Sequence, residues 1–114
     1  MKQKILIIDD EVDYCMILKN YFQAKSYQVT CGFTSKECLQ LLEEVHPNIL
    51  FLDNNLPDGK GWNLINTITE KFPSLKIFLI SAYHKNSDET TPYGKNITVW
   101  EKPISFNLLS QVFK

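Results

Sequence analysis

Five short segments rich in isoleucine, leucine, valine and aromatic residues constrain the fold of this 114-residue chain more than any other feature. They lie at residues 4–8, 27–31, 48–53, 75–80 and 97–100. The first, third and fourth contain unbroken apolar runs, which indicates β-strands buried on both faces. Strands that alternate with helices form a parallel sheet with right-handed crossovers and helices on both faces. We therefore expect an α/β fold.

The stretches between the expected strands carry the 3.6-residue apolar period of amphipathic helices. Helices are expected at residues 13–25, at residues 62–72, at residues 104–113 and in the stretch that ends before Pro47. Thr34 or Ser35 can cap the helix that ends before Pro47, because a side-chain oxygen at either position can accept a hydrogen bond from a backbone N–H of the first turn. No linker or repeat interrupts the pattern, so residues 1–114 are expected to form one domain.

Two connecting segments depart from this rhythm. Residues 83–96 lack an apolar period, and Pro92 and Gly94 oppose a long helix, so a short or irregular fourth helix is expected there. Residues 54–61 have strong turn chemistry, and we expect Asp58 to serve the turn.

Composition narrows the classes of function. The net charge is −1 and basic residues do not cluster, which argues against direct binding of nucleic acid. No apolar run approaches the roughly 20 residues of a membrane span, and no secretory signal is visible. Cys15, Cys31 and Cys38 are odd in number and lack metal-site spacing, as expected for reduced thiols. We expect a cytoplasmic protein.

Polar residues come at the ends of four of the expected strands. They are Asp9 and Asp10, Asp53, Ser81, and Lys102. Ligands of parallel α/β sheets bind outside the carboxyl ends of the strands, so these side chains are expected to meet. Two carboxylates about 4 Å apart repel by about 4 kcal/mol at an effective dielectric near 20. Three acids there favour protonation or the arrival of a cation.

The residue types in this cluster point to phosphoryl transfer. An incompletely enclosed site of oxygen ligands suits Mg²⁺, with Mn²⁺ as a substitute, and Asp9 and Asp10 would hold the ion. Asp53 can act as the nucleophile. Lys102 can pair with one phosphoryl oxygen, and Ser81 can donate a hydrogen bond to another.

Four motifs follow one another in the order and spacing of a known family. They are Ile7-Ile8-Asp9-Asp10-Glu11, Leu52-Asp53-Asn54-Asn55-Leu56-Pro57 with Gly61 eight residues after Asp53, Ile80-Ser81-Ala82, and Lys102-Pro103. Over nearly its whole length the chain resembles the receiver domain of bacterial two-component response regulators, the chemotaxis-regulator-like phosphoacceptor family. The resemblance implies a flavodoxin-like, doubly wound sheet of five parallel strands in the order 2-1-3-4-5.

The resemblance also implies roles for single residues. It implies Mg²⁺ at the three acids and at the backbone carbonyl of Asn55, and a cis bond before Pro103 that aims the lysine into the site. Ala82 fits the small residue that leaves room for the phosphoryl group. Asn55 and Tyr83 occupy positions that often tune dephosphorylation, and Tyr83 either shields the acyl phosphate or is a surface residue without a kinetic role. The phosphoryl donor would be a sensor histidine kinase or a histidine phosphotransfer protein.

The chain departs from the family at its conformational switch. The aromatic residue that usually stands three positions before the lysine is Val99 here, and Trp100 follows it. Strand alternation sends Trp100 to the other face, where it is either a packed core residue or a substitute switch. The output pathway, a following output domain and a homodimer all stay open.

Three functions compete at this point. The leading hypothesis is a self-phosphorylating acceptor with intrinsic hydrolysis of its aspartyl phosphate, which is not a metabolic enzyme. One alternative is a non-phosphorylated receiver that acts as a protein-interaction module, which the absence of the switch aromatic favours. The other is a phosphatase or phosphotransferase that acts on outside substrates, but Asn55 stands where such enzymes carry a second acid.

Overall fold

A five-stranded parallel sheet forms the centre of the computed structural model, which describes residues 3–81, 96–102 and 104–113. Its strands are β1 (Lys4–Ile8), β2 (Gln28–Gly32), β3 (Ile49–Asp53), β6 (Lys76–Ser81) and β7 (Ile97–Glu101). They lie in the order β2-β1-β3-β6-β7. This confirms the predicted order, because β4 (Asn55–Leu56) and β5 (Gly59–Lys60) form a separate antiparallel hairpin.

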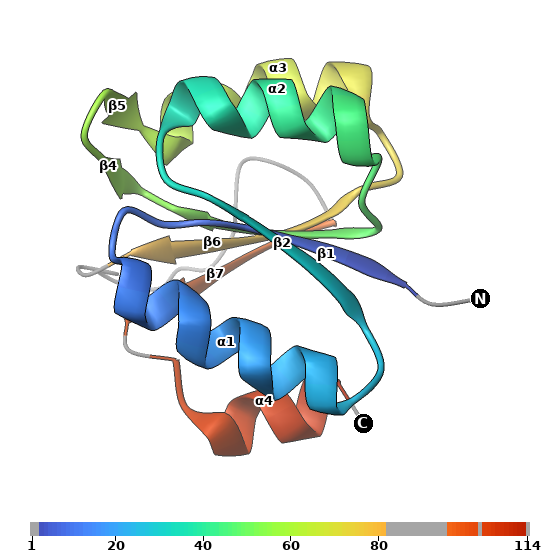
Figure 1. Cartoon of the computed structure of the whole chain (residues 1–114). Helices are drawn as coiled ribbons and strands as arrows, with labels where there is room; N and C mark the ends of the chain where they lie inside the picture. The colour runs from blue at the N-terminus through green and yellow to red at the C-terminus, as the bar shows by residue number, and fades with distance from the viewer. Residues whose placement is uncertain (1–2, 82–95, 103, 114) are drawn as a thin grey trace.

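Helices cover both faces of the sheet (Figure 1). They are α1 (Val12–Ala24), α2 (Ser35–Val45), the 3₁₀ helix η1 (Gly61–Leu64), α3 (Ile65–Lys71) and α4 (Phe106–Val112). α2 and α3 lie on one face, and α1 and α4 lie on the other. Thr34 caps α2 as one of the two predicted candidates, because its Oγ1 accepts a hydrogen bond from the Glu37 N–H at 3.1 Å.

Several element ends are shifted by one residue, and three further differences from the sequence predictions are larger. The helix predicted at residues 62–72 is divided, since its first turn is the 3₁₀ helix η1. The last helix begins two residues later than predicted because Ser105 caps it, accepting the Leu108 N–H at 3.2 Å. The turn-rich loop contains the β4–β5 hairpin. The predicted irregular fourth helix lies outside the described residues.

Side chains of successive strand residues point to opposite faces, so the sheet separates two hydrophobic clusters. The cluster under α2 and α3 is aliphatic, with Leu6, Ile8, Leu42, Leu50, Leu52, Ile65, Ile68, Ile77 and Leu79 among its members. The cluster under α1 and α4 is rich in aromatic rings, with Phe22, Phe51, Phe78 and Phe113 at its centre. One face of the sheet is therefore packed mainly by aliphatic side chains, and the other largely by aromatic rings.

Trp100 is partly buried and packs against the aromatic cluster. Its ring lies 4.6 Å from that of Phe78 and 6.3 Å from that of Phe51, between ring centroids. Val99 packs on the opposite, aliphatic face. Trp100 is partly buried and packs as expected for that face, and its alternative role as a substitute switch stays a prediction.

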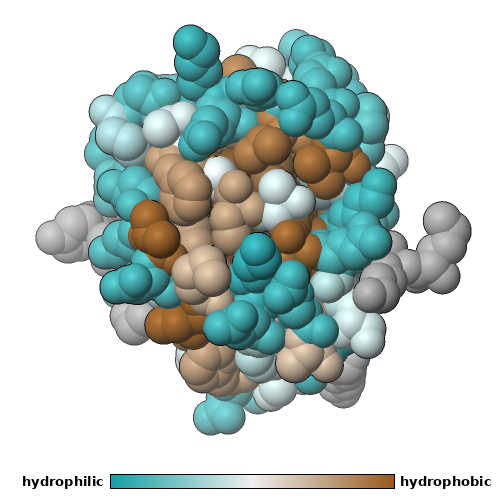
Figure 2. Space-filling model, in the orientation of Figure 1, coloured by the Kyte–Doolittle hydropathy of each residue, from teal (hydrophilic) through white to brown (hydrophobic). Residues whose placement is uncertain are grey.

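The surface carries several large apolar side chains. Figure 2 shows brown and tan apolar residues next to one another in the middle of the view, with teal hydrophilic residues around them. Val12 and Ile17 of α1 and Phe106 of α4 are among the exposed large hydrophobic residues. Val12 and Ile17 line one shallow pocket, and exposed apolar side chains of this kind are common on folded proteins. Within the described part of the chain, no helix has the length and apolar character needed to cross a bilayer.

Candidate functional site

The carboxyl ends of β1 and β3 bring three acids together. Asp9 and Asp10 follow β1, and Asp53 is the last residue of β3. One carboxylate oxygen from each lies within 4.8 Å of the others. Asp9 and Asp53 are each only 3% exposed, whereas Asp10 is open to solvent. The predicted acidic cluster therefore exists, and its exposed member leaves a way in for a ligand.

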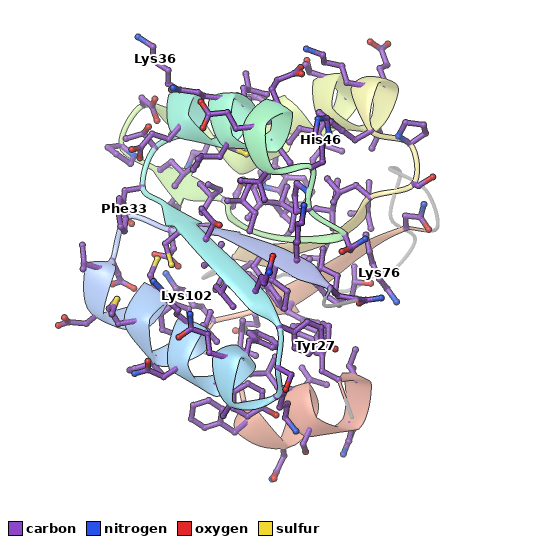
Figure 3. All side chains as sticks on the ribbon, turned by 45° about the vertical axis from the view of Figure 1, so that its right-hand side comes forward. Tyr27, Phe33, Lys36, His46, Lys76 and Lys102 are labelled. Atoms are coloured by element: carbon purple, nitrogen blue, oxygen red, sulfur yellow. The ribbon has the colours of Figure 1, made fainter. Side chains whose placement is uncertain are left out.

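Lys102 joins this cluster from the end of β7. Its Nζ lies 3.1 Å from Asp9 Oδ2, 3.0 Å from Glu11 Oε1 and 3.7 Å from Asp53 Oδ2. Burial acts to lower the pKa of the amine, but the bonds to Glu11 and Asp9 prevail, so the pKa of Lys102 is raised and the amine stays charged. Figure 3 shows Lys102 beside α1, where Nζ also lies 5.0 Å from the ring centroid of Tyr14.

The acids are held in an unfavourable environment. Burial raises the pKa of Asp53 to about 6, and the charge of Asp9 adds to the effect. The pKa of Asp9 is also raised, chiefly by burial, although the Glu11 N–H at 2.9 Å and Lys102 act in the opposite direction. Buried carboxylates that resist ionisation, with one open neighbour, form a donor set that fits a hard divalent cation such as Mg²⁺.

Asn55 lies at the start of the hairpin and faces the acids. Its N–H donates to Asp53 Oδ1 at 3.2 Å. Asn55 pairs with Lys60 in an antiparallel ladder, and a residue in such a ladder turns its N–H and C=O to the same side. We therefore expect the Asn55 carbonyl to face the carboxylates, as a further cation ligand requires.

Ser81 ends β6, the strand beside β3, and is buried. Its carbonyl accepts the Lys102 N–H at 2.9 Å, which links the ends of β6 and β7. The structure thus places Ser81 and Lys102 at the same edge of the sheet as the acids. Ala82, Tyr83 and Pro103 lie outside the described residues, so their predicted roles, including the cis bond, stay predictions.

Asn54 is a site residue that sequence reasoning missed. It is buried next to Asp53, its N–H donates to the Ile80 carbonyl at 2.8 Å, and its Oδ1 accepts the Trp62 N–H at 2.9 Å. Its carbonyl accepts the Gly61 N–H at 2.9 Å, which closes the loop at its base. Nothing in the local sequence separates such a residue from an ordinary loop asparagine.

Gly61 is required by the close approach of the backbone at the end of β3. A Cβ at this position would lie 2.8 Å from the carbonyl oxygen of Asp53 and 3.2 Å from the Cα of Asn54. Only glycine permits this approach without displacing Asp53, which explains the glycine eight residues after it.

Glu11 and Asp58 also contribute contacts that the sequence did not predict. Glu11 binds Lys102, as described above. Asp58 lies in the hairpin turn, as expected, but its carboxylate also accepts the N–H groups of Ser35 at 2.7 Å and Lys36 at 3.2 Å. These partners are 23 and 22 residues away along the chain, beyond any local pattern.

Comparison with known proteins points to one family. The family model described as the response regulator receiver domain matches residues 5–113. A CheY-like receiver domain protein from Methanospirillum hungatei is 25% identical with a TM-score of 0.84, covering 98% of this chain and 91% of that one. A two-component response regulator from Clostridium difficile is 24% identical with a TM-score of 0.82, covering 97% and 92%.

A third solved structure shares the fold at lower identity. It is a response regulator protein from Burkholderia pseudomallei with a phosphorylated aspartic acid, calcium ion and citrate. It is 17% identical with a TM-score of 0.80, and the match covers 99% of this chain and 67% of that one.

Proposed function

Because this chain belongs to the response regulator receiver domain family, we propose that Asp53 accepts a phosphoryl group from a phosphohistidine on a sensor histidine kinase or a histidine phosphotransfer protein. One observation carries the proposal. A buried carboxylate at the end of a central strand lies within 4.8 Å of two further acids and 3.7 Å from a lysine amine. This arrangement suits a nucleophile in phosphoryl transfer.

The proposed step is a displacement at phosphorus. An Asp53 carboxylate oxygen forms the O–P bond while the N–P bond of the phosphohistidine breaks, and the electron pair of that bond stays on the imidazole nitrogen. With a pKa of about 6, Asp53 is mostly ionised near neutral pH and can therefore attack. Later attack of water on phosphorus would release inorganic phosphate and restore the carboxylate.

Asp9, Asp10, Asp53 and the Asn55 carbonyl are the groups that would hold Mg²⁺, or Mn²⁺ in its place. The bound ion would neutralise charge on the transferring group. Lys102 forms ion pairs with both Asp9 and Glu11, and we propose that its amine gives up one of these contacts to bind a phosphoryl oxygen. Ser81 would donate a hydrogen bond to another oxygen. The Burkholderia pseudomallei structure, which shares this fold, contains a phosphorylated aspartic acid and a calcium ion.

The wider setting is part of the same proposal. Residues 1–114 would act as one signalling domain in the cytoplasm, where the kinase supplies the phosphoryl group and an output protein or fused domain reads the result. Intrinsic hydrolysis of the aspartyl phosphate would end the signal, without turnover of metabolites.

A second candidate function is a receiver that binds a partner without being phosphorylated. It is favoured by the switch position, since Val99 is not aromatic and Trp100 packs among Phe51 and Phe78 on the other face. Under this proposal the acids would take no part in phosphorylation.

Phosphorylation with a small donor separates the two candidates. The protein is incubated with phosphoramidate or acetyl phosphate and Mg²⁺, and intact mass is measured. We expect one added phosphate, lost in Asp53→Asn and on chelation with EDTA, and retained in Asp13→Asn, which removes an exposed acid of α1 outside the cluster. A folded protein that gains no phosphate would leave the interaction module as the better account. Turnover of a phosphomonoester would instead favour a phosphatase.

A further inference from the structure

The loop that carries Asn55 is held at two separate places. At its base, Asn54 joins β6 and the start of η1 through the three hydrogen bonds described above. At its tip, Asp58 binds the first turn of α2 through Ser35 and Lys36. Figure 1 shows the hairpin beside the beginning of α2, and Figure 3 marks Lys36 there. The hairpin is therefore tied to a helix that belongs to a different part of the chain.

The contact at the tip is chemically well matched. The first N–H groups of a helix lack partners inside the helix, and a carboxylate there also interacts favourably with the helix dipole. Thr34 accepts the Glu37 N–H, while Asp58 accepts the N–H groups of Ser35 and Lys36, so the two caps do not overlap. The pKa of Asp58 is lowered, first by the bond from the Ser35 backbone, in keeping with an ionised acceptor.

Asn55 lies between these two points of attachment. Its N–H binds Asp53 Oδ1 at 3.2 Å, and its own Oδ1 accepts from Lys60 Nζ at 2.8 Å. Gly59, directly after Asp58, has a φ of +152°, a conformation that favours glycine and closes the tight turn. In a hairpin this short, a shift of the tip moves the strand that contains Asn55.

We propose that Asp58 is a positioning residue for the divalent cation: by binding the start of α2, it holds the hairpin so that the Asn55 carbonyl faces the acids. This inference rests on the proposed function for the identity of the ion site. It differs from the role of a turn residue or helix cap, because it connects α2 to cation affinity.

The test compares two caps of one helix. Thr34→Ala removes a cap from α2 without touching the hairpin, whereas Asp58→Ala removes a cap and frees the hairpin. Mg²⁺ affinity of the full chain is measured by isothermal titration calorimetry, and exchange of the Ser35 and Lys36 amides is followed by NMR. We expect Asp58→Ala to weaken Mg²⁺ binding about tenfold, as loss of a supporting contact does at other metal sites, and Thr34→Ala to leave it unchanged.

A second variant separates position from charge. Asp58→Asn is as neutral as Asp58→Ala but can still accept a hydrogen bond at the helix start, so it should recover part of the lost affinity. Wild-type affinity in Asp58→Ala would overturn the inference, as would equal weakening in Thr34→Ala or no recovery in Asp58→Asn. Failure of the wild-type protein to bind Mg²⁺ would contradict the proposed function itself, together with the inference that rests on it.

Discussion

The faces of the sheet and its carboxyl edge are built from the same strands but affect stability in opposite directions. Leu50 and Phe51 in the middle of β3 are almost fully buried among apolar neighbours, and their burial favours folding. Asp53, two residues beyond Phe51, is buried to a similar degree beside two other acids, and burial raises its pKa. The cost of the site is therefore confined to the strand ends, next to a core that can offset it.

The largest expected effect is on the core side of this comparison. Phe51 is 1% exposed, and its ring stacks on Phe78 at 5.0 Å between centroids. Phe51→Ala should lower the free energy of unfolding by about 3–5 kcal/mol, because it removes apolar contacts and leaves a cavity. Leu52→Ala, on the aliphatic face, should cost about 2–5 kcal/mol. Urea unfolding in EDTA measures the free energy of unfolding of both variants. A loss well under about 1 kcal/mol in both would contradict the view that burial of these apolar side chains stabilises the fold.

Neutralising Asp53 should change the free energy of unfolding in the opposite direction. Asp53→Asn should raise the free energy of unfolding by about 1–3 kcal/mol near neutral pH in EDTA, since each pKa unit corresponds to about 1.4 kcal/mol. The measurement is the same urea titration, repeated across pH. Added Mg²⁺ should stabilise the wild-type protein more than the variant, because the cation relieves repulsion that Asp53→Asn has already reduced.

The pH dependence follows from the direction of the shift. The folded pKa of Asp53 lies above its ordinary value of 3.8, so the folded protein holds its proton more tightly than the unfolded chain. Stability is therefore greatest below about pH 4 for this group and is lost as pH rises through about 6. The gain from Asp53→Asn should vanish at the acidic end, and a gain that is the same at every pH would show a different cause.

The smallest effect is expected for a carboxylate on the open surface. Glu43 pairs with Lys71, and both side chains are more than half exposed. The hydrogen bond from Lys71 lowers the pKa of Glu43, so this pair stabilises above the ordinary pKa and its contribution is lost as pH falls. Glu43→Gln should therefore destabilise slightly near neutral pH, close to the detection limit of urea unfolding. A stabilisation as large as that of Asp53→Asn would mean that burial is not what makes the site costly.

Local patterns were enough to predict the sheet, most of the helices and the acids at the strand ends. Apolar runs report burial on two faces, and parallel strands place their carboxyl ends at one edge whatever the details of the loops. The same reasoning explains why Trp100 was expected to pack away from Val99, since alternation along a strand is a local property. Boundaries were less accurate where a cap such as Ser105 competed with the apolar period.

By itself, the sequence determined which residues lie together at the carboxyl edge of the sheet: Asp9, Asp10, Asp53, Ser81 and Lys102. Only the tertiary structure decided how they are held. Asn54 and Asp58 bind groups on other elements, and the need for glycine at position 61 depends on a backbone that approaches it from β3. Periodicity along a chain reports the environment of each face, whereas hydrogen bonds between distant segments depend on distances that exist only after the elements have packed.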